Sequence, residues 1–143
     1  MEVLTTKRFE FSSAHRYWNP EWSAEHNNQV FGKCTNPHGH GHNYVLEVSV
    51  EGVPHPVTGM VLDLKELKDV LKREVVDLYD HRFLNYEVPP FDRVNPTAEN
   101  IAREIWRRLE PSLSSNGNKL RQVRLYETPD LWVDYAGEEA CSA

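Results

Sequence analysis

The sequence predicts an α+β domain: an antiparallel four-stranded sheet with two helices packed on one face. Alternating apolar residues occur near both ends of the chain, and two segments with apolar residues three and four positions apart lie between them. This strand-strand-helix-helix-strand-strand order favours helices gathered on one side of an antiparallel sheet. The 143 residues fit a single domain, which we place at residues 1–136, followed by a flexible tail at residues 137–143.

The first expected strand covers residues 3–15. Its odd positions share one face, because side chains alternate along an extended chain, and that face ends at His15. Residues 16–37 follow neither the strand nor the helix period, so we expect a long loop there. Loops of that length in compact domains usually carry function, and this one leads to Cys34.

The second expected strand begins with a pair of histidines. Apolar residues alternate from Tyr44 to residue 50, and the same inward parity extends back to His42 and His40. Both imidazoles should therefore point to one side. Gly39 and Gly41 separate them and leave room for the backbone around a ligand site.

The first helix is expected to start at Asp63, which forms a capping pair with Glu66. The helix ends near Asp80 and His81, before the breaker Pro89-Pro90, so this acid and imidazole lie at a helix exit. Its expected buried stripe is Leu64, Leu67, Leu71, Val75 and Leu78.

The second helix is expected to start at Asn95-Pro96-Thr97, with proline at the first helical position, and to end at Pro111. Residues 120–128 then predict a strand with Glu127 in an apolar parity position, and residues 131–136 its hairpin partner. The buried stripe of this helix is Ala98, Ile101, Ala102, Ile105 and Leu109.

Charge and composition limit the classes of partner. The net charge of −6 argues against nucleic-acid binding, which usually requires a basic surface. Neither a signal-peptide pattern at the start nor a run long enough to span a membrane is present, so we expect a cytoplasmic protein. The two cysteines, Cys34 and Cys141, do not form a disulfide framework, which leaves Cys34 as a free thiol or a metal ligand.

His15, His40 and His42 are the predicted metal ligands. Zinc takes about four donors at roughly 2.0–2.3 Å, and three histidines leave one position open for a substrate. His38 is a competing ligand, although its place beside Pro37 makes a position on the strand less certain. The main rival is a closed structural site with Cys34 as the fourth ligand.

Four polar residues, Cys34, Asp80, His81 and Glu127, offer acid–base chemistry and substrate binding. A thiol near zinc or an imidazolium has a lowered pKa, so Cys34 could act as a base near neutral pH. Asp80 could orient His81 as a proton relay to Cys34, provided that the fold brings them together. A carboxylate such as Glu127 can accept paired N–H bonds from a guanidine-like ring edge.

These residues occur within a longer series of motifs that resembles the 6-pyruvoyl-tetrahydropterin synthase and 6-carboxy-tetrahydropterin synthase family. The matching stretches, in sequence order, are residues 11–16 (FSSAHR), 31–34 (FGKC), 39–44 (GHGHNY), 80–81 (DH), 96–100 (PTAEN) and 126–128 (YET). The resemblance implies the tunnelling fold (T-fold), a homohexamer built as a dimer of trimers, and active sites between subunits. Two positions depart from the common pattern: Ala98, where a second threonine is common, and His38, where asparagine often stands.

By this resemblance, His15, His40 and His42 would bind Zn²⁺ and Cys34, Asp80 and His81 would transfer protons. Glu127 and Thr97 would hold the pterin ring, and Lys33 and Arg16 lie near the site in sequence as candidates for the triphosphate. The implied enzyme is a carbon–oxygen lyase that converts 7,8-dihydroneopterin triphosphate to 6-pyruvoyl-tetrahydropterin without an external redox cofactor.

Two alternatives remain open at this stage. A 6-carboxy-tetrahydropterin synthase of queuosine biosynthesis would release acetaldehyde as well as triphosphate from the same substrate. The loop lengths around Cys34 resemble the pyruvoyl type more closely. A non-catalytic protein with structural zinc is the third reading, since a fold alone does not assign a function.

Overall fold

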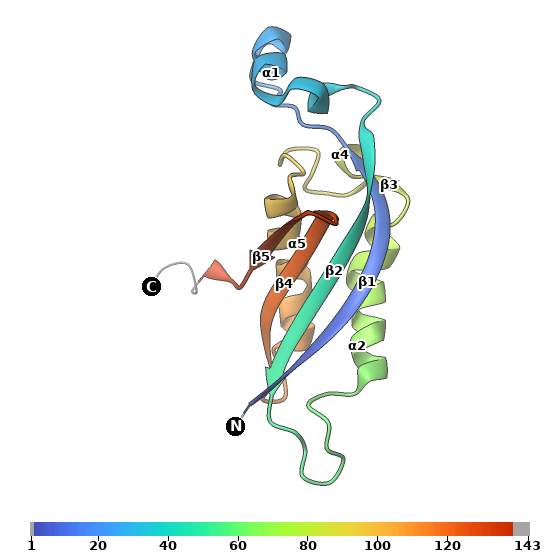
Figure 1. Ribbon diagram of the computed structural model, residues 1–143, viewed down its shortest axis with the longest axis vertical. Helices are drawn as coiled ribbons and strands as arrows, with labels where there is room; N and C mark the ends of the chain where they lie inside the picture. Colours follow the sequence, from blue (N-terminus) through green and yellow to red (C-terminus); the bar gives the residue numbers. More distant parts are fainter. Residues whose placement is uncertain (1, 139–143) are drawn as a thin grey trace.

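The computed structural model describes residues 2–138, which form one twisted sheet with the long helices on one side (Figure 1). The strands are β1 (Val3–His15), β2 (His40–Gly52), β3 (Arg82–Phe83), β4 (Lys119–Thr128) and β5 (Leu131–Tyr135). The helical segments are α1 (Ala24–Phe31), η1 (Gly32–Thr35), α2 (Leu64–Leu71), η2 (Lys72–Val76), α3 (Asp77–Tyr79), α4 (Leu84–Glu87) and α5 (Ala98–Leu113). The α+β class is confirmed. Most of the tail expected at residues 137–143, including Cys141, lies outside the described residues.

The sheet has five strands in the order β3-β1-β2-β4-β5, so the expected number of four was wrong. The four long strands are antiparallel neighbours, as expected. The additional strand β3 has only two residues and runs parallel to the end of β1. It is anchored there because Asp80 and His81, just before it, bond to the backbone of Ser12. Two residues are too few to show an alternating pattern in the sequence.

The pairing of β1 with β2 brings the predicted metal ligands together. His15 lies opposite His40, and Ser13 lies opposite His42. Residues directly opposite each other in an antiparallel pair point to the same face of the sheet. The three imidazoles are therefore on the helix-covered face, at the end of the sheet where β1 ends and β2 begins (Figure 1).

Residues 16–37 were expected to be an irregular loop, but they contain α1 and η1. Ser23 caps α1, and its hydroxyl accepts from the His26 N–H at 3.1 Å. Gly32, with a φ of 57°, ends the helix. Only Asn27 of α1 is buried, so the helix has no apolar stripe by which the sequence could have revealed it.

The helix expected after Asp63 is present, and the Asp63 carboxylate accepts from the Lys65 N–H at 2.9 Å. Its predicted stripe is wrong at both ends, because Leu64 and Leu78 are exposed. The buried residues are instead Leu67, Val70, Leu71, Val75 and Tyr79. A spacing of four residues drifts by about 40° per step on an α-helix, and the wide π-helical turn η2 compensates for that drift.

The second long helix, α5, starts two positions later than expected, at Ala98 instead of Pro96, and continues past Pro111 to Leu113. Thr97 is its N-cap, with the hydroxyl oxygen accepting from the Asn100 N–H at 3.2 Å, and Pro96 lies outside the helix. Pro111 lies inside the last turn of α5, where its nitrogen cannot donate the usual backbone hydrogen bond. All the residues of the predicted stripe are buried.

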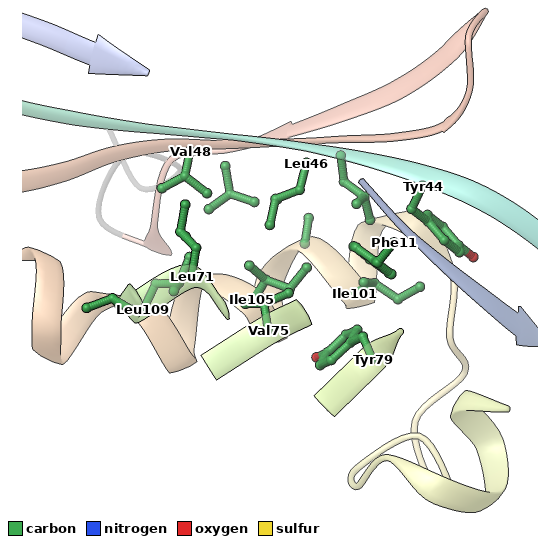
Figure 2. Packing of buried hydrophobic residues seen from close by; sticks show 14 of the residues in the cluster. Phe11, Tyr44, Leu46, Val48, Leu71, Val75, Tyr79, Ile101, Ile105 and Leu109 are labelled. Atoms are coloured by element: carbon green, nitrogen blue, oxygen red, sulfur yellow. The ribbon is translucent and has the colours of Figure 1, made fainter. Parts of the chain in front are cut away.

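The core lies between the sheet and the helices α2, α3 and α5 (Figure 2). From the sheet it receives Phe11, Tyr44, Leu46 and Val48, and from the helices Leu71, Val75, Tyr79, Ile101, Ile105 and Leu109. Burial of these side chains fixes the register of β1 against β2, since a slip by one residue would expose one complete face. No helix among residues 2–138 combines the length and apolar character that crossing a bilayer requires.

Candidate functional site

Three imidazoles form a compact cluster where β1 and β2 meet. One nitrogen from each of His15, His40 and His42 can be chosen so that all three lie within 4.8 Å of one another. The ring centroids of His15 lie 4.6 Å from His40 and 5.1 Å from His42. His15 is completely buried and the other two are half-buried, so the cluster is open on one side only.

His15 is oriented by its hydrogen bonds. Its Nδ1 lies 2.7 Å from the carbonyl oxygen of Pro96 and 3.2 Å from the hydroxyl of Tyr44. A carbonyl can only accept, so Nδ1 carries the proton and Nε2 presents its lone pair to the cluster. Burial, together with His40 and His42, lowers the His15 pKa from 6.5 to about 4. The ring is therefore neutral at pH 7, as a metal ligand must be.

His42 offers a second nitrogen to the same point. Its Nε2 is buried and has no hydrogen-bond partner among residues 2–138, although Glu127 Oε1 lies 3.2 Å away. Burial is also the main cause that lowers the His42 pKa, while Glu127 acts in the opposite direction. Glu127 Oε1 is also 3.4 Å from His15 Nε2. The carboxylate thus lies beside the cluster, where it can face both an ion and a substrate.

The arrangement of these donors fits a tetrahedral divalent ion. His15 Nε2 and His40 Nε2 are 3.0 Å apart. Two nitrogens bound tetrahedrally at about 2.0–2.1 Å would be separated by roughly 3.3 Å. A buried lone pair without a partner is costly, and a metal ion would satisfy it on His42. The residues present therefore fit the predicted metal, and three histidines could hold it with a position left open.

Cys34 lies in η1, immediately after α1, and is a half-buried free thiol. Its carbonyl accepts from the Tyr17 N–H at 2.7 Å, and the Tyr17 ring lies 5.1 Å from His15. Burial and then Glu127 raise the Cys34 pKa. Within residues 2–138 the surroundings of Cys34 therefore disfavour the thiolate, whereas a nearby cation would favour it.

Asp80 and His81 form a pair at the edge of β1. His81 Nδ1 lies 3.0 Å from Asp80 Oδ2, and Asp80 Oδ1 accepts from the Ser12 N–H at 2.8 Å. That backbone bond is the largest cause of the lowered Asp80 pKa, and the His81 side chain is 83% exposed. Among residues 2–138 no hydrogen bond or ion pair joins this pair to Cys34. The fold therefore brings Asp80 and His81 together. Within the described part of one subunit it does not bond them to Cys34.

The other residues singled out in the sequence have different surroundings. Arg16 donates through Nη2 to the Thr35 carbonyl at 2.7 Å and lies over the Trp18 ring at 4.5 Å. Its buried Nε has no hydrogen-bond partner among residues 2–138, so the guanidinium is only partly engaged. Lys33 and His38 are exposed, and His38 is not part of the histidine cluster. Thr97 uses its hydroxyl oxygen as a helix cap, which leaves the hydroxyl hydrogen free to donate.

Two tyrosines belong to the site but were not recognised from the sequence. Tyr44 was assigned only to the core, yet its hydroxyl contacts His15. The Tyr17 ring packs on His15, and burial and the charges of Glu127, Cys34 and Glu99 raise the pKa of the phenol. Tyr17 follows His15 by two residues in an apparently irregular segment, so only the fold could reveal its position.

An α+β fold with a histidine cluster that could hold a metal, a thiol and a carboxylate is typical of a metal-dependent enzyme site. The model of the 6-pyruvoyl tetrahydropterin synthase family matches residues 4–138. The chain belongs to this family.

Individual relatives agree with this assignment over nearly the full length. A 6-pyruvoyl tetrahydrobiopterin synthase of Dictyostelium discoideum is 42% identical, covering 95% of this chain and 97% of that protein. The structure of Caenorhabditis elegans 6-pyruvoyl tetrahydropterin synthase superimposes with a TM-score of 0.90 at 37% identity, covering 96% of this chain and 97% of that one. A 6-carboxy-5,6,7,8-tetrahydropterin synthase of Rickettsia conorii is 30% identical, covering 92% and 99%.

Proposed function

We propose that this protein is a zinc-dependent 6-pyruvoyl-tetrahydropterin synthase, a carbon–oxygen lyase acting on 7,8-dihydroneopterin triphosphate. The observation that carries the proposal is the convergence of His15, His40 and His42 beside Cys34 and Glu127 in a member of this family. A bound zinc ion would supply a Lewis acid that makes the C–H bond next to the substrate hydroxyls acidic. The expected cytoplasmic location stays a prediction.

The protein's own groups account for binding and proton transfer. Cys34, as the thiolate, takes the proton from the activated carbon, and His81, held by Asp80, returns one. The raised pKa of Cys34 is offset when positive charge is present at the histidine cluster, because a nearby cation favours the thiolate. Glu127 accepts from the ring N–H groups of the pterin, and the free hydroxyl hydrogen of Thr97 is available to a ring acceptor.

A homo-oligomer would complete this site. Asp80 and His81 lie at the outer edge of β1 with the imidazole 83% exposed, whereas Cys34 lies close enough to Glu127 for that carboxylate to raise its pKa. A proton relay from His81 to a thiol needs the groups within hydrogen-bond reach. We therefore assign the pair to the Cys34 of a neighbouring copy, in line with the hexamer that the family resemblance implies. Sedimentation analysis should give an assembly larger than a monomer.

The product distinguishes this proposal from the 6-carboxy alternative. The higher identity to the pyruvoyl-type relative, 42% against 30%, favours 6-pyruvoyl-tetrahydropterin. Incubation with 7,8-dihydroneopterin triphosphate followed by mass spectrometry should give this product and triphosphate. Detection of 6-carboxy-tetrahydropterin with acetaldehyde would establish the alternative.

A substitution separates a catalytic thiol from a structural ligand. Cys34→Ala should keep its zinc and assembly but lose most turnover, because three histidines already complete the ligand set. Cys141→Ala is the control for loss of the other thiol in the sequence and should keep its activity. Loss of zinc and unfolding of Cys34→Ala would instead identify a closed structural site, the non-catalytic reading.

A further inference from the structure

The two turns that carry the proposed catalytic groups are both attached to the end of β1. Asp80 and His81 bond to the backbone of Ser12, with the His81 N–H donating to the Ser12 carbonyl at 2.6 Å. The η1 turn with Cys34 is attached a few residues later in the sequence, through Arg16 and Tyr17. The position of residues 16 and 17 therefore determines where the thiol lies relative to the histidine cluster.

Two hydrogen bonds hold the Cys34 turn. The Arg16 guanidinium donates to the Thr35 carbonyl at 2.7 Å, and the Tyr17 N–H donates to the Cys34 carbonyl at the same distance. The Trp18 ring supports the guanidinium, at 4.5 Å. Within residues 2–138 these are the two hydrogen bonds that join η1 to the segment just after β1.

The backbone of Arg16 is in turn held by the side chain of Asn85. The Arg16 N–H donates to Asn85 Oδ1, and Asn85 Nδ2 donates to the Arg16 carbonyl, both at 2.9 Å. Asn85 lies on α4, directly after β3, and the pairing of β3 with β1 stops at Ala14. The Asn85 side-chain amide thus gives the Arg16 backbone one donor and one acceptor. It takes the place of the backbone groups that one more residue of β3 would provide.

We propose that Asn85 is a positioning residue that sets the place of the Cys34 thiol through Arg16. This inference rests on the proposed function, in which Cys34 is the proton-transferring base. Within residues 2–138 no hydrogen bond joins Asn85 to the histidine cluster or to the thiol, so it acts through the backbone of Arg16. It also links the segment that carries Asp80 and His81 to the segment that carries Cys34. A displacement of the turn that carries Asp80 and His81 would therefore also displace the turn that carries Cys34 in the same subunit.

The test compares Asn85→Ala with Asn118→Ala as a matched control. Asn118 Nδ2 also joins distant segments, donating to the Val61 carbonyl at 2.9 Å, but at the opposite end of the sheet. Alkylation of Cys34 by iodoacetamide is measured in a Cys141→Ser background without substrate, together with zinc content, kcat and KM. Asn85→Ala should change the alkylation rate several-fold and lower kcat about tenfold, because small displacements of a reacting group are costly. Zinc content and KM should stay near the parent values.

Asn118→Ala should leave all four quantities unchanged and affect stability alone. Equal alkylation rates and equal kcat in the two variants would overturn the inference. If Asn85→Ala fails to fold, Asn85→Asp provides the test, since it keeps the acceptor for the Arg16 N–H and loses the donor. Its effect should lie between those of the parent and complete loss, and a parent-like thiol and kcat would overturn the inference.

Arg16→Lys tests the second half of this connection, because it removes the bond to Thr35 and leaves Asn85 in place. It should reproduce the altered alkylation rate and the lower kcat. A raised KM with unchanged kcat and alkylation would make Arg16 a substrate ligand and overturn the inference. The alkylation measurement needs no turnover, so it judges the role of Asn85 even if Cys34→Ala were to show that the proposed function is wrong.

Discussion

Substituting Gly39 by alanine should destabilise the protein and disturb the metal site. Two causes contribute, the backbone conformation of Gly39 and its close approach to Phe83, and they can be measured separately. Gly39 has a φ of +71°, and a Cβ there would lie 2.6 Å from the Phe83 ring and 3.1 Å from the His15 carbonyl oxygen. The left-handed backbone costs an alanine about 1–2 kcal/mol. Displacement of the Phe83 ring adds about 1–3 kcal/mol. The expected total is thus roughly 2–5 kcal/mol in the free energy of unfolding.

Gly59→Ala is the matched control. Gly59 has nearly the same φ, +74°, but a Cβ there would meet nothing within 4 Å, so only the backbone cost remains. Urea unfolding at equal protein concentration should show Gly39→Ala to be less stable than Gly59→Ala by about 1–3 kcal/mol. Zinc affinity should fall in Gly39→Ala alone, since His40 is the next residue.

A double substitution identifies the cause of the difference. In a Phe83→Ala background, Gly39→Ala should cost little more than Gly59→Ala, because the ring that it displaces is gone. Equal destabilisation by Gly39→Ala and Gly59→Ala in the parent protein would refute the reasoning. It would mean that Phe83 moves aside freely and that the close approach at Gly39 does not constrain the site.

Three further predictions concern the histidine cluster. In the metal-free protein, stability should be highest above pH 6.5 and fall towards pH 4, because the unfolded state binds a proton at His15 that the folded state does not bind. The pKa difference from 6.5 to about 4 corresponds to roughly 3 kcal/mol in the free energy of unfolding. A urea midpoint independent of pH would contradict this prediction. His40→Ala should lose most of its zinc by elemental analysis while its circular dichroism spectrum is retained, and unchanged zinc would remove His40 from the ligand set. Tyr44→Phe should weaken zinc binding about tenfold, because it removes the hydroxyl that contacts His15. Competition with a chelator measures the affinity, and a value equal to that of the parent protein would contradict the prediction.

The long elements could be predicted from sequence because each one has a clear period. Alternation defined β1, β2 and β4, and spacing by three and four residues defined α2 and α5. The short elements were missed for physical reasons. α1 has no buried apolar stripe and begins at its Ser23 cap, and β3 has two residues whose pairing depends on contacts with Ser12.

The buried stripe of the first helix shows a different limit. Leu64 and Leu78 fit an ideal helix, but both are exposed, and Tyr79 takes the inward position instead. The wide turn η2 changes the phase of the helix, and nothing in the hydrophobic pattern reveals where such a turn occurs. Packing against the sheet decides it.

The sequence by itself determined the chemistry available to this protein: the three imidazoles, the free thiol and the carboxylate at an inward strand position. Side-chain alternation is a local property, so the shared direction of His40 and His42 followed from their spacing alone. Only the tertiary structure decided which groups meet. The register of β1 against β2 placed His15 opposite His40, and the pairing of β3 with β1 placed Asp80 and His81 beside Ser12. Such relations depend on contacts between residues far apart in the sequence, which no local period encodes.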